Sequence, residues 1–589
     1  MLSTRWWLVA AAVCIVAPAC NGDKETAVAS DADTDTDTDT DTDTDTDTDT
    51  DTDTDTDTDT DTAPPVVAQL IESGIVVCED PDLRDSEGPM YAPAFGADWD
   101  AGQHGQSRWP KPISGYPLIG FGVGVDDFDG DGGMDVFLPN FGQDQLFMTT
   151  PSGELIDDSA TRWDVTSSMP TEAVLPVDID GDDDLDLFIG NRGTPNQVYF
   201  NDGGVFTVGD VGLLDENLHT LGATFADIDL DGDLDLFVFN HAEVEFQDVF
   251  GEKELIGDPD RLYENDGTGY FIDITHRIPD DTNHGFTYQA GFFDTDGDLY
   301  PDLYRNNDVG FVATPNTLHR NPGPGGDMFI DMSEETGLDM LVAGMGLGAG
   351  DINGDQIVDF FITNFGPVFL LESFEYTDWF DAANLREIDP SHKWGNYALW
   401  GADFVDMDND GELDIFTLSG EWMIGEEMKA NPVEQPDFLY IRQPDGTYQD
   451  QAPAWDLDDM GNNRGLVLTD MNRDGYMDVV RRDITGPAAI RWSRCGDDAW
   501  LNIDLRGPAP NTRAVGARVE VSSGGVIHTR WVTAGGRSFA SGGPYEIHVG
   551  LGDVDVVDRI EVNWPDGLRS TWDAVPARQH LQVVRDVAW

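Results

Sequence analysis

The chain has 589 residues, more than one hydrophobic core usually holds, so we expect two folded domains or one large repeat architecture. Hydrophobic residues make up 40% of it, which is enough for a folded protein. The formal net charge of −84 argues against partners such as nucleic acid or anionic lipid. Such an excess also opposes a compact state. It therefore indicates either bound divalent cations or a generally acidic, halophilic-type surface.

Residues 1–20 have the features of an export signal. Arg5 supplies a positive charge, and the apolar run at 8–16 is too short to span a bilayer. Residues 16–20 resemble a bacterial lipoprotein box in which Cys20 receives the lipid, although 17–19 also fit an ordinary A-x-A cleavage site. We favour lipidation, because a Cys directly after these small residues is otherwise unexplained. The expected location is the bacterial outer membrane or cell surface, with a periplasmic or secreted protein as the alternative.

Residues 21–62 form a linker dominated by an uninterrupted Asp-Thr repeat from Asp33 to Thr62. The repeat has no apolar residue to bury and carries dense like charge, so we expect it to be disordered and extended. Its expected role is a stalk that lifts the folded part off a membrane, which the protein meets only through a lipid anchor. A calcium-binding tail is the alternative. An N-terminal extension, residues 63–117, follows.

One loop sequence, D-x-[DN]-x-D-x-x-x-D, occurs seven times, with 49 to 67 residues between successive starts. Repeats of this length are typical of propellers and solenoids. The candidate metal ligands are Asp127, Asp129, Asp131 and Asp135; Asp178, Asp180, Asp182 and Asp186; Asp227, Asp229, Asp231 and Asp235; Asp294, Asp296, Asp298 and Asp302; Asp351, Asn353, Asp355 and Asp359; Asp406, Asp408, Asp410 and Asp414; and Asp470, Asn472, Asp474 and Asp478.

The spacing of these ligands fits a calcium site. Ca²⁺ prefers six to eight oxygen ligands at about 2.3–2.6 Å, and side chains at alternate positions of a tight loop can converge on one point. We expect the backbone carbonyl two residues after the third acid to add a ligand and the last Asp to close the shell. A charge run is usually a solvated face, but 26 Asp and two Asn in 28 positions favour about seven bound Ca²⁺ ions.

Apolar runs flank each loop and predict strands, not the helices of an EF-hand. Residues 187–189 after the second loop and 291–293 before the fourth are examples. Further strand and turn signals follow within each repeat. Each repeat is therefore expected to contain four short strands, the content of one propeller blade.

These loops resemble FG-GAP/VCBS repeats over residues 118–495, as in the run from Asp127 to Gly132. The resemblance implies the seven-bladed β-propeller found in integrin α-subunits. Each copy has Gly at its fourth or sixth position, where a tight turn needs positive φ. At the sixth position Asp183, Leu299 and Gln356 replace the common Gly, so we expect weaker or distorted sites in those three loops.

Residues 499–589 contain no such loop, and they alternate apolar and polar residues in the manner of strands, as in 558–562. Three stretches resemble the ASPIC/UnbV domain, namely 514–519, 550–552 and 562–567. The expected fold is therefore all-β, a seven-bladed β-propeller of the integrin α type followed by a small β-sandwich-like domain. Residues 542–544 depart from the Ser-rich run expected before the Gly-Leu-Gly, so no local role is assigned to that turn.

Two cysteines remain outside the export signal, Cys78 and Cys495. An even pair in an exported protein indicates a disulfide, and these two flank the repeat region. The alternative is two independent buried thiols.

Three intervals between loops are long, those that begin at Asp227, Asp351 and Asp406. We expect the extra residues after the strand that follows each loop, hence on the face opposite the metals, where insertions often form a binding face. Their aromatic side chains could bind a glycan or a protein, or they could cover the propeller's own apolar surface, and both interpretations stay open. The residues concerned are Phe246, Phe250, Phe374, Tyr376, Trp379, Phe380, Trp394, Tyr397, Trp400, Trp422 and Met423.

The sequence contains no H-E-x-x-H, no G-x-S-x-G and no phosphate-binding Gly loop, and its ten His show no metal-ligand spacing. Carboxylates are too numerous to single out a glycosidase pair. We therefore expect no catalytic residue. The expected protein is a calcium-binding module for adhesion to an extracellular protein or glycan. The alternative is a propeller-based extracellular enzyme, a polysaccharide lyase or hydrolase, which rests on fold-level analogy alone.

Overall fold

The computed structural model describes residues 68–78, 91–93, 122–140, 143–163, 170–214, 216–242, 255–279, 283–374, 376, 378–388, 397–421, 434–484, 488–586 and 589. All of them belong to one compact unit, residues 65–589. The predicted export signal with Cys20, the Asp-Thr linker and most of the N-terminal extension lie outside the described residues. Within the described part, no helix combines the length and the apolar character needed to cross a membrane.

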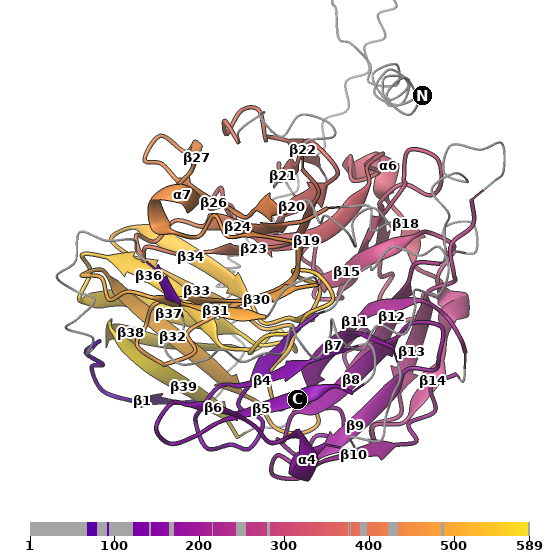
Figure 1. Cartoon of the computed structure of the whole chain (residues 1–589), viewed down its shortest axis with the longest axis horizontal. Coiled ribbons are helices and arrows are strands. Elements are labelled where there is room, and N and C mark those ends of the chain that lie inside the picture. The colour runs from indigo at the N-terminus through magenta and orange to yellow at the C-terminus, as the bar shows by residue number, and fades with distance from the viewer. Residues whose placement is uncertain are drawn as a thin grey trace, which may run out of the picture. The chain divides into compact units, whose positions relative to one another are not determined.

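Seven four-stranded antiparallel blades confirm the predicted β-propeller (Figure 1). In each blade the acidic loop joins the first two strands. The first four blades contain β3 (Gly124–Asp126), β4 (Asp135–Leu138), β5 (Gln145–Thr149) and β6 (Leu155–Asp157); β7 (Thr171–Val177), β8 (Asp186–Asn191), β9 (Gln197–Asn201) and β10 (Phe206–Gly209); β11 (Thr220–Ala226), β12 (Asp235–Asn240), β13 (Arg261–Asn265) and β14 (Phe271–Asp273); and β15 (Thr287–Phe293), β16 (Asp302–Asn307), β17 (Thr317–Arg320) and β18 (Ile330–Asp331).

The remaining blades follow the same plan. They contain β19 (Gly344–Gly350), β20 (Asp359–Asn364), β21 (Phe369–Ser373) and β22 (Trp379–Asp381); β23 (Leu399–Val405), β24 (Asp414–Ser419), β26 (Phe438–Arg442) and β27 (Tyr448–Asp450); and β29 (Asn463–Thr469), β30 (Asp478–Asp483) and β31 (Ala489–Ser493). Short segments between blades are α4 (Ser159–Arg162), η1 (Thr275–Arg277), α6 (Ser333–Thr336), α7 (Ala452–Trp455) and the pair β25 (Gln435–Pro436) and β28 (Met460–Gly461).

The apolar runs form strands because neighbouring blades cover both of their faces. All seven residues of β7 and all six of β8 are buried, which explains their nearly continuous apolar sequence. The outer strands alternate instead, and β14 buries Phe271 while Ile272 stays exposed.

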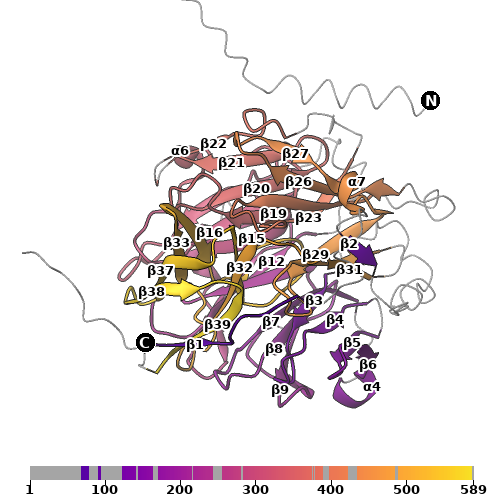
Figure 2. The same cartoon turned by 90° about the vertical axis from the view of Figure 1, so that its left-hand side faces the viewer.

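The N-terminal segment closes the seventh blade. Strand β2 (Tyr91–Pro93) pairs with β31 and becomes the fourth strand of that sheet (Figure 2). The seventh repeat thus takes its outermost strand from a segment that precedes the first repeat.

The C-terminal region forms the predicted small β-sandwich-like domain. Its two sheets have the strand orders β1-β39-β32-β36 and β34-β33-β37-β38, and their buried side chains belong to one apolar cluster. The strands are β32 (Ala499–Arg506), β33 (Arg518–Ser523), β34 (Val526–Trp531), β36 (Ile547–Gly552), β37 (Val556–Asn563), β38 (Arg569–Pro576), β39 (Gln579–Arg585) and β1 (Ala68–Glu72), which the N-terminal segment contributes.

The segment 534–543 of this domain lies on the propeller axis and contacts the first strand of every blade. The backbone N–H groups of Val125 and Val174 donate to the carbonyls of Gly542 and Ala540, and Ser538 and Leu347 exchange two backbone hydrogen bonds. The other contacts are the pairing of β35 (Ala534–Gly535) with β11, a bond from the Gln289 side chain to the Arg537 carbonyl, the packing of Phe539 on Trp400, and a bond from the Ser538 hydroxyl to the Leu466 carbonyl. A Cβ on Gly542 would lie 2.5 Å from Pro176, so this close approach requires glycine.

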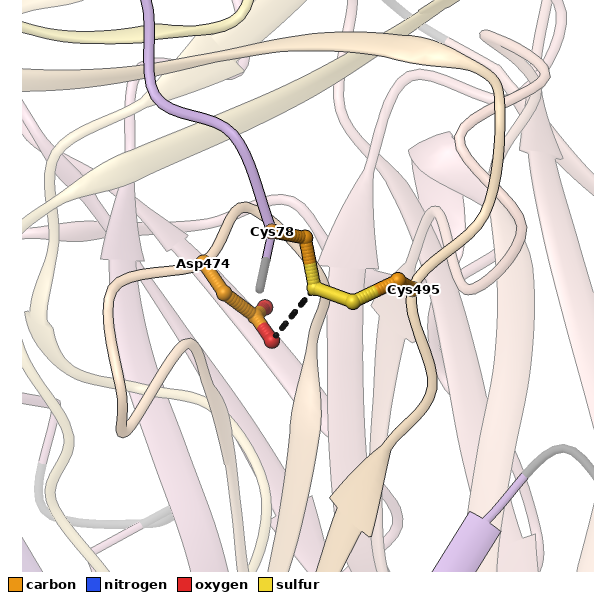
Figure 3. Close-up of side chains that lie close together, drawn as sticks. All are labelled: Cys78, Asp474 and Cys495. Atoms are coloured by element: carbon orange, nitrogen blue, oxygen red, sulfur yellow. Dashed lines mark hydrogen bonds between the residues drawn. A yellow bond between two sulfur atoms is a disulfide. The ribbon is translucent and has the colours of Figure 1, made fainter. Parts of the chain in front are cut away.

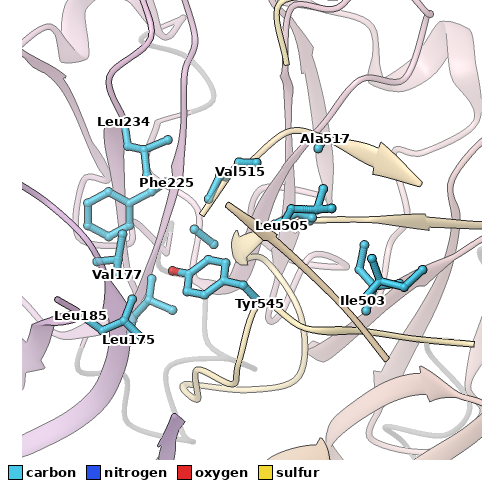
Figure 4. Packing of buried hydrophobic residues seen from close by; sticks show 14 of the residues in the cluster. Leu175, Val177, Leu185, Phe225, Leu234, Ile503, Leu505, Val515, Ala517 and Tyr545 are labelled. Atoms are coloured by element: carbon cyan, nitrogen blue, oxygen red, sulfur yellow. The ribbon is translucent and has the colours of Figure 1, made fainter. Parts of the chain in front are cut away.

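A continuous apolar contact also joins the two domains (Figure 4). Leu175, Val177 and Phe225 of the propeller belong to the same buried cluster as Leu505 and Val515 of the C-terminal domain. Tyr545 points across the junction and donates a hydrogen bond to the Pro176 carbonyl at 2.7 Å. The C-terminal domain is therefore packed on the propeller.

In the long interval after Asp351, the extra residues do not lie where the sequence predicted them. Its loop between β20 and β21 is only four residues, 365–368, so the extra residues do not follow the strand after the acidic loop. They lie instead after β21, at 374–378, and after β22. The reason is a tight turn, in which the Asn364 side chain donates to the Pro367 carbonyl. Phe374 and Tyr376 consequently lie at the acidic-loop end of the blade, and a Cβ at Gly297 in the fourth loop would lie 3.3 Å from Tyr376.

Candidate metal centre

The first Asp of each loop holds the turn together, as the second loop illustrates. Asp178 Oδ1 accepts hydrogen bonds from the backbone N–H of Gly181 and Asp182, at 2.8 and 3.2 Å. Its Oδ2 accepts the N–H of Asp183 at 3.0 Å. The same carboxylate also receives the Thr512 hydroxyl of the C-terminal domain. The local sequence therefore wraps the backbone around the first carboxylate.

The last Asp of each loop begins the second strand and ties the loop to the third strand. In the second blade, Asp186 Oδ2 accepts the N–H of Ile179, at 3.0 Å, and Oδ1 accepts the N–H of Asn201 from the third strand, at 2.9 Å. The equivalent pair of bonds occurs in all seven blades, at Asp135, Asp235, Asp302, Asp359, Asp414 and Asp478 as well. This residue thus has a structural role as well as a predicted ligand role.

Burial disfavours the ionised form of several loop carboxylates. Burial, together with neighbouring carboxylates, raises the pKa of Asp178 to about 6 and that of Asp227 to about 7. Burial raises the pKa of Asp186 to about 8, although its backbone hydrogen bonds oppose the shift. Carboxyl groups that cluster and lose solvent favour the neutral form unless a cation compensates them.

The loops fit a hard cation by two observations. In the first three loops, one carboxylate oxygen of the first, second and last predicted ligands lies within 4.8 Å of the others, and in the fourth loop the first three do so. In addition, buried Oδ1 atoms of Asp129, Asp296 and Asp406 have no hydrogen-bond partner. A set of only oxygen donors, with unsatisfied buried oxygens, is suited to Ca²⁺.

One acidic residue was missing from the predicted ligands. Asp233 occupies the seventh position of the third loop, where a backbone carbonyl was expected to contribute. It is buried, its Oδ1 has no partner, and burial with the nearby Asp231, Asp227 and Asp229 raises its pKa to about 7. The sequence signal was that Asp233 continues the alternate spacing of Asp227, Asp229 and Asp231.

The two Asn ligands differ from the Asp ligands in one contact. Asn353 Nδ2 donates to Asp355 Oδ2, and Asn472 Nδ2 donates to Asp474 Oδ2, both at 3.1 Å. Each Asn side chain is uncharged, and its amide group orients the carboxylate two residues later by this hydrogen bond. The Asn oxygens accept the backbone N–H groups of Asp355 and Asp474.

The predicted Cys78–Cys495 disulfide is present beside the seventh loop (Figure 3). The Cys78 sulfur lies 3.2 Å from Asp474 Oδ2. Because a disulfide sulfur carries no proton, this contact is packing and the cysteines are not metal ligands.

The described aromatic residues of the long intervals differ in burial. Trp379 and Trp400 are buried, and their indole N–H groups donate to the carbonyls of Val358 and Gly420. These two cover the propeller's own apolar surface. Phe374, Tyr376 and Phe380 are exposed, by 64%, 42% and 43%. Tyr397 packs at the edge of the Phe438 ring. Phe246, Phe250, Trp394, Trp422 and Met423 lie outside the described residues.

Residues 178–238 match the FG-GAP-like repeat family, and residues 507–588 match the ASPIC and UnbV family. Cartilage acidic protein 1 of Mus musculus is 28% identical over 284 residues, which covers 45% of this chain and 40% of the mouse protein. The Xenopus tropicalis protein is 26% identical over 314 residues, which covers 49% and 43%. The chain thus spans less than half the length of these relatives.

Two solved structures match this chain at low identity and with low TM-scores. YCF48 from Cyanidioschyzon merolae has 10% identity and a TM-score of 0.37, covering 64% of this chain and 97% of that one. The extracellular domain of a putative hybrid two component system from B. thetaiotaomicron has 9% identity and a TM-score of 0.38, covering 79% and 56%. The chain thus has a seven-bladed propeller in which residues 178–238 match the FG-GAP-like repeat family, followed by a domain in which residues 507–588 match the ASPIC and UnbV family, and over part of its length it is similar to cartilage acidic protein 1.

Proposed function

We propose that this protein is an exported calcium-binding propeller that acts as a binding module at the cell surface, for a protein or a glycan. The observation that carries the proposal is the repeated acidic loop with buried carboxylate oxygens that lack partners, as at Asp129, Asp296 and Asp406. Bound Ca²⁺ would neutralise the clustered carboxylates. The protein's own residues then hold the turns and present the surrounding surface to a partner.

Export is supported by the disulfide between Cys78 and Cys495, since disulfides persist in oxidising compartments. Lipidation of Cys20, with the Asp-Thr segment as a stalk, is the form of surface attachment that we propose. Mass spectrometry of the mature N-terminus tests it, because a lipid on Cys20 and a free N-terminus after an A-x-A cleavage have different masses.

Calcium binding is tested by counting ions bound to the full chain and by following its melting before and after chelation. We expect about seven ions and a large fall in melting temperature on chelation, because a ligand that binds only the native state stabilises it. Asp129→Ala should remove one ion, whereas Asp202→Ala, on an exposed turn outside the loops, should remove none. One or no ions with unchanged melting would contradict the proposal.

The partner surface that we propose includes the exposed Phe374, Tyr376 and Phe380, because exposed aromatic groups often anchor partners. A triple Ala variant should lose binding to surface glycans or proteins of neighbouring cells while it keeps its calcium ions. Trp379→Ala is not a suitable test, because this buried residue supports the fold. Turnover of polysaccharides, in place of saturable binding, would favour the lyase or hydrolase alternative.

A further inference from the structure

The C-terminal domain covers some acidic loops and leaves others open. A methyl group on the loop glycine would lie 3.0 Å from Pro510 at Gly181, 3.3 Å from Trp589 at Gly232, 2.9 Å from His528 at Gly411 and 1.7 Å from Trp500 at Gly475. These contacts belong to the loops of blades 2, 3, 6 and 7. At Gly130 and Gly132 of the first loop, by contrast, no atom lies within 4 Å.

The first loop opens into a cleft of about 870 Å³ between the propeller and the C-terminal domain. Asp127 and Asp131 form part of its wall on the propeller side, and Asp504 and Arg506 form part of the opposite wall. Solvent can therefore reach the first loop, while the four covered loops lie against protein.

Side chains of the C-terminal domain donate directly to predicted metal ligands. The Thr512 hydroxyl donates to Asp178 Oδ2 in the second loop. The Asn502 side-chain amide donates to Asp470 Oδ2 in the seventh loop, at 3.0 Å. Both aspartates are 2% exposed. Donors of this kind orient a metal-binding carboxylate and set its affinity, even though they do not touch the ion.

A chain of contacts through the C-terminal domain also connects two loops. The ring nitrogens of His548 lie 2.6 Å from Oδ1 of Asn502 and 2.6 Å from Oδ1 of Asn409, which belongs to the sixth loop. Asn409 in turn donates to the Gly475 carbonyl of the seventh loop, at 3.0 Å. The sixth and seventh loops therefore share contacts with one strand pair of the C-terminal domain, β32 and β36.

We propose that the C-terminal domain contributes to the calcium sites through Asn502 and Thr512, which act as positioning residues. Calcium binding and the docking of this domain on the propeller then strengthen each other. The inference rests on the calcium binding proposed above. If docking of the C-terminal domain raises the calcium affinity by some factor, bound calcium must raise the docking equilibrium constant by the same factor. Ions in the four covered loops then leave more slowly than the ion in the open first loop.

The test uses the full chain loaded with Tb³⁺, whose luminescence is excited through nearby tryptophans. Trp500 and Trp589 lie against the seventh and third loops and belong to the C-terminal domain, so their excitation reports ions in covered loops. After addition of a chelator we expect a fast release that includes the ion of the first loop, and a slow release of at least four ions that includes those excited through Trp500 and Trp589. Release of every ion in one fast phase overturns this inference and leaves calcium binding intact. Failure to bind any ion overturns both.

Variants of the positioning residues provide the second part of the test. Thr512→Val should speed release from one covered loop about tenfold, within the usual effect of removing such a donor. Thr512→Ser keeps the hydroxyl and should restore the slow release. The control Thr571→Val changes an exposed Thr of the same domain and should have no effect.

If Thr512→Val does not fold, Asn502→Ala gives the same test at the seventh loop, where the Trp500-excited phase should become faster. Melting in excess calcium identifies variants that merely lose stability. A folded Thr512→Val or Asn502→Ala protein that releases its ions at the original rates overturns the proposal.

Discussion

At the residue scale, each acidic loop needs two left-handed backbone positions. The fourth and sixth residues have positive φ in all seven loops, and only the first loop has Gly at both. In the others one position carries a side chain, namely Asp183, Leu230, Leu299, Gln356, Asn409 or Arg473. Asp183, Leu299 and Gln356 therefore keep the conformation of the common Gly, with φ of 78°, 76° and 69°, and the backbone of those turns is not distorted. The cost is local strain of about 1 kcal/mol per residue.

Gly354→Ala and Gly475→Ala should separate this backbone strain from packing. Gly354 has φ of 79° and no atom within 4 Å of an added Cβ, so its replacement should cost about 1 kcal/mol of unfolding free energy. Gly475→Ala also meets the Trp500 ring, and overpacking should add about 1–3 kcal/mol. Denaturant unfolding in excess calcium measures both. Equal losses would mean that Trp500 moves away without cost.

At the element scale, each blade is a hairpin of two buried strands closed by a carboxylate-centred turn and joined to the third strand by the last Asp. Because Asp186 accepts one N–H from its own loop and one from Asn201, the loop cannot open without loosening the third strand. Calcium in a loop is therefore expected to stiffen the whole blade.

The metal-free protein should become less stable as pH rises. The pKa values of Asp178, Asp227 and Asp186 are raised by burial to about 6, 7 and 8, from 3.8. The folded protein then binds more protons than the unfolded chain, so this contribution to stability is complete below about pH 4 and is lost as pH rises through 6 to 8. Melting temperature in a chelator should fall over that range.

With excess calcium the same pH series should show the opposite trend. The ion binds the ionised carboxylates, so acidification weakens binding and lowers the melting temperature. Parallel pH profiles with and without calcium would contradict the assignment of these carboxylates as ligands.

At the scale of the whole molecule, the N-terminal segment is bound to both domains. Strand β1 extends a sheet of the C-terminal domain, Cys78 is bonded to Cys495 beside the seventh loop, and β2 completes the seventh blade. The propeller is thus closed by residues that precede it, and the axial segment 534–543 is held within it.

The disulfide should contribute strongly to stability, since it joins residues 417 positions apart in the sequence. Replacement of Cys78 and Cys495 by Ser should lower the unfolding free energy by about 2–5 kcal/mol, because the unfolded chain gains freedom. Guanidinium unfolding of the double variant measures this. An unchanged midpoint would show that β1 and β2 hold the segment without the covalent bond.

The blades and the candidate metal loops could be predicted from local sequence patterns. Each predicted ligand set spans nine residues, and the strands that flank it are short apolar runs, so local spacing was sufficient. Asp233 was missed because the comparison with an EF-hand loop assigned its position to a backbone carbonyl. The interval after Asp351 was misplaced because length alone does not tell which turn of a blade carries extra residues.

The contacts between the two domains could not be predicted from the sequence. Thr512 and Asp178 are 334 residues apart, and Val123 and Ser541 are 418 apart. Such contacts depend on shape and on hydrogen-bond geometry at two distant surfaces, which leave no periodic pattern in either segment. For the same reason Trp379 and Phe380 are neighbours in sequence, yet one supports the core and the other faces solvent, because alternate strand residues point to opposite faces.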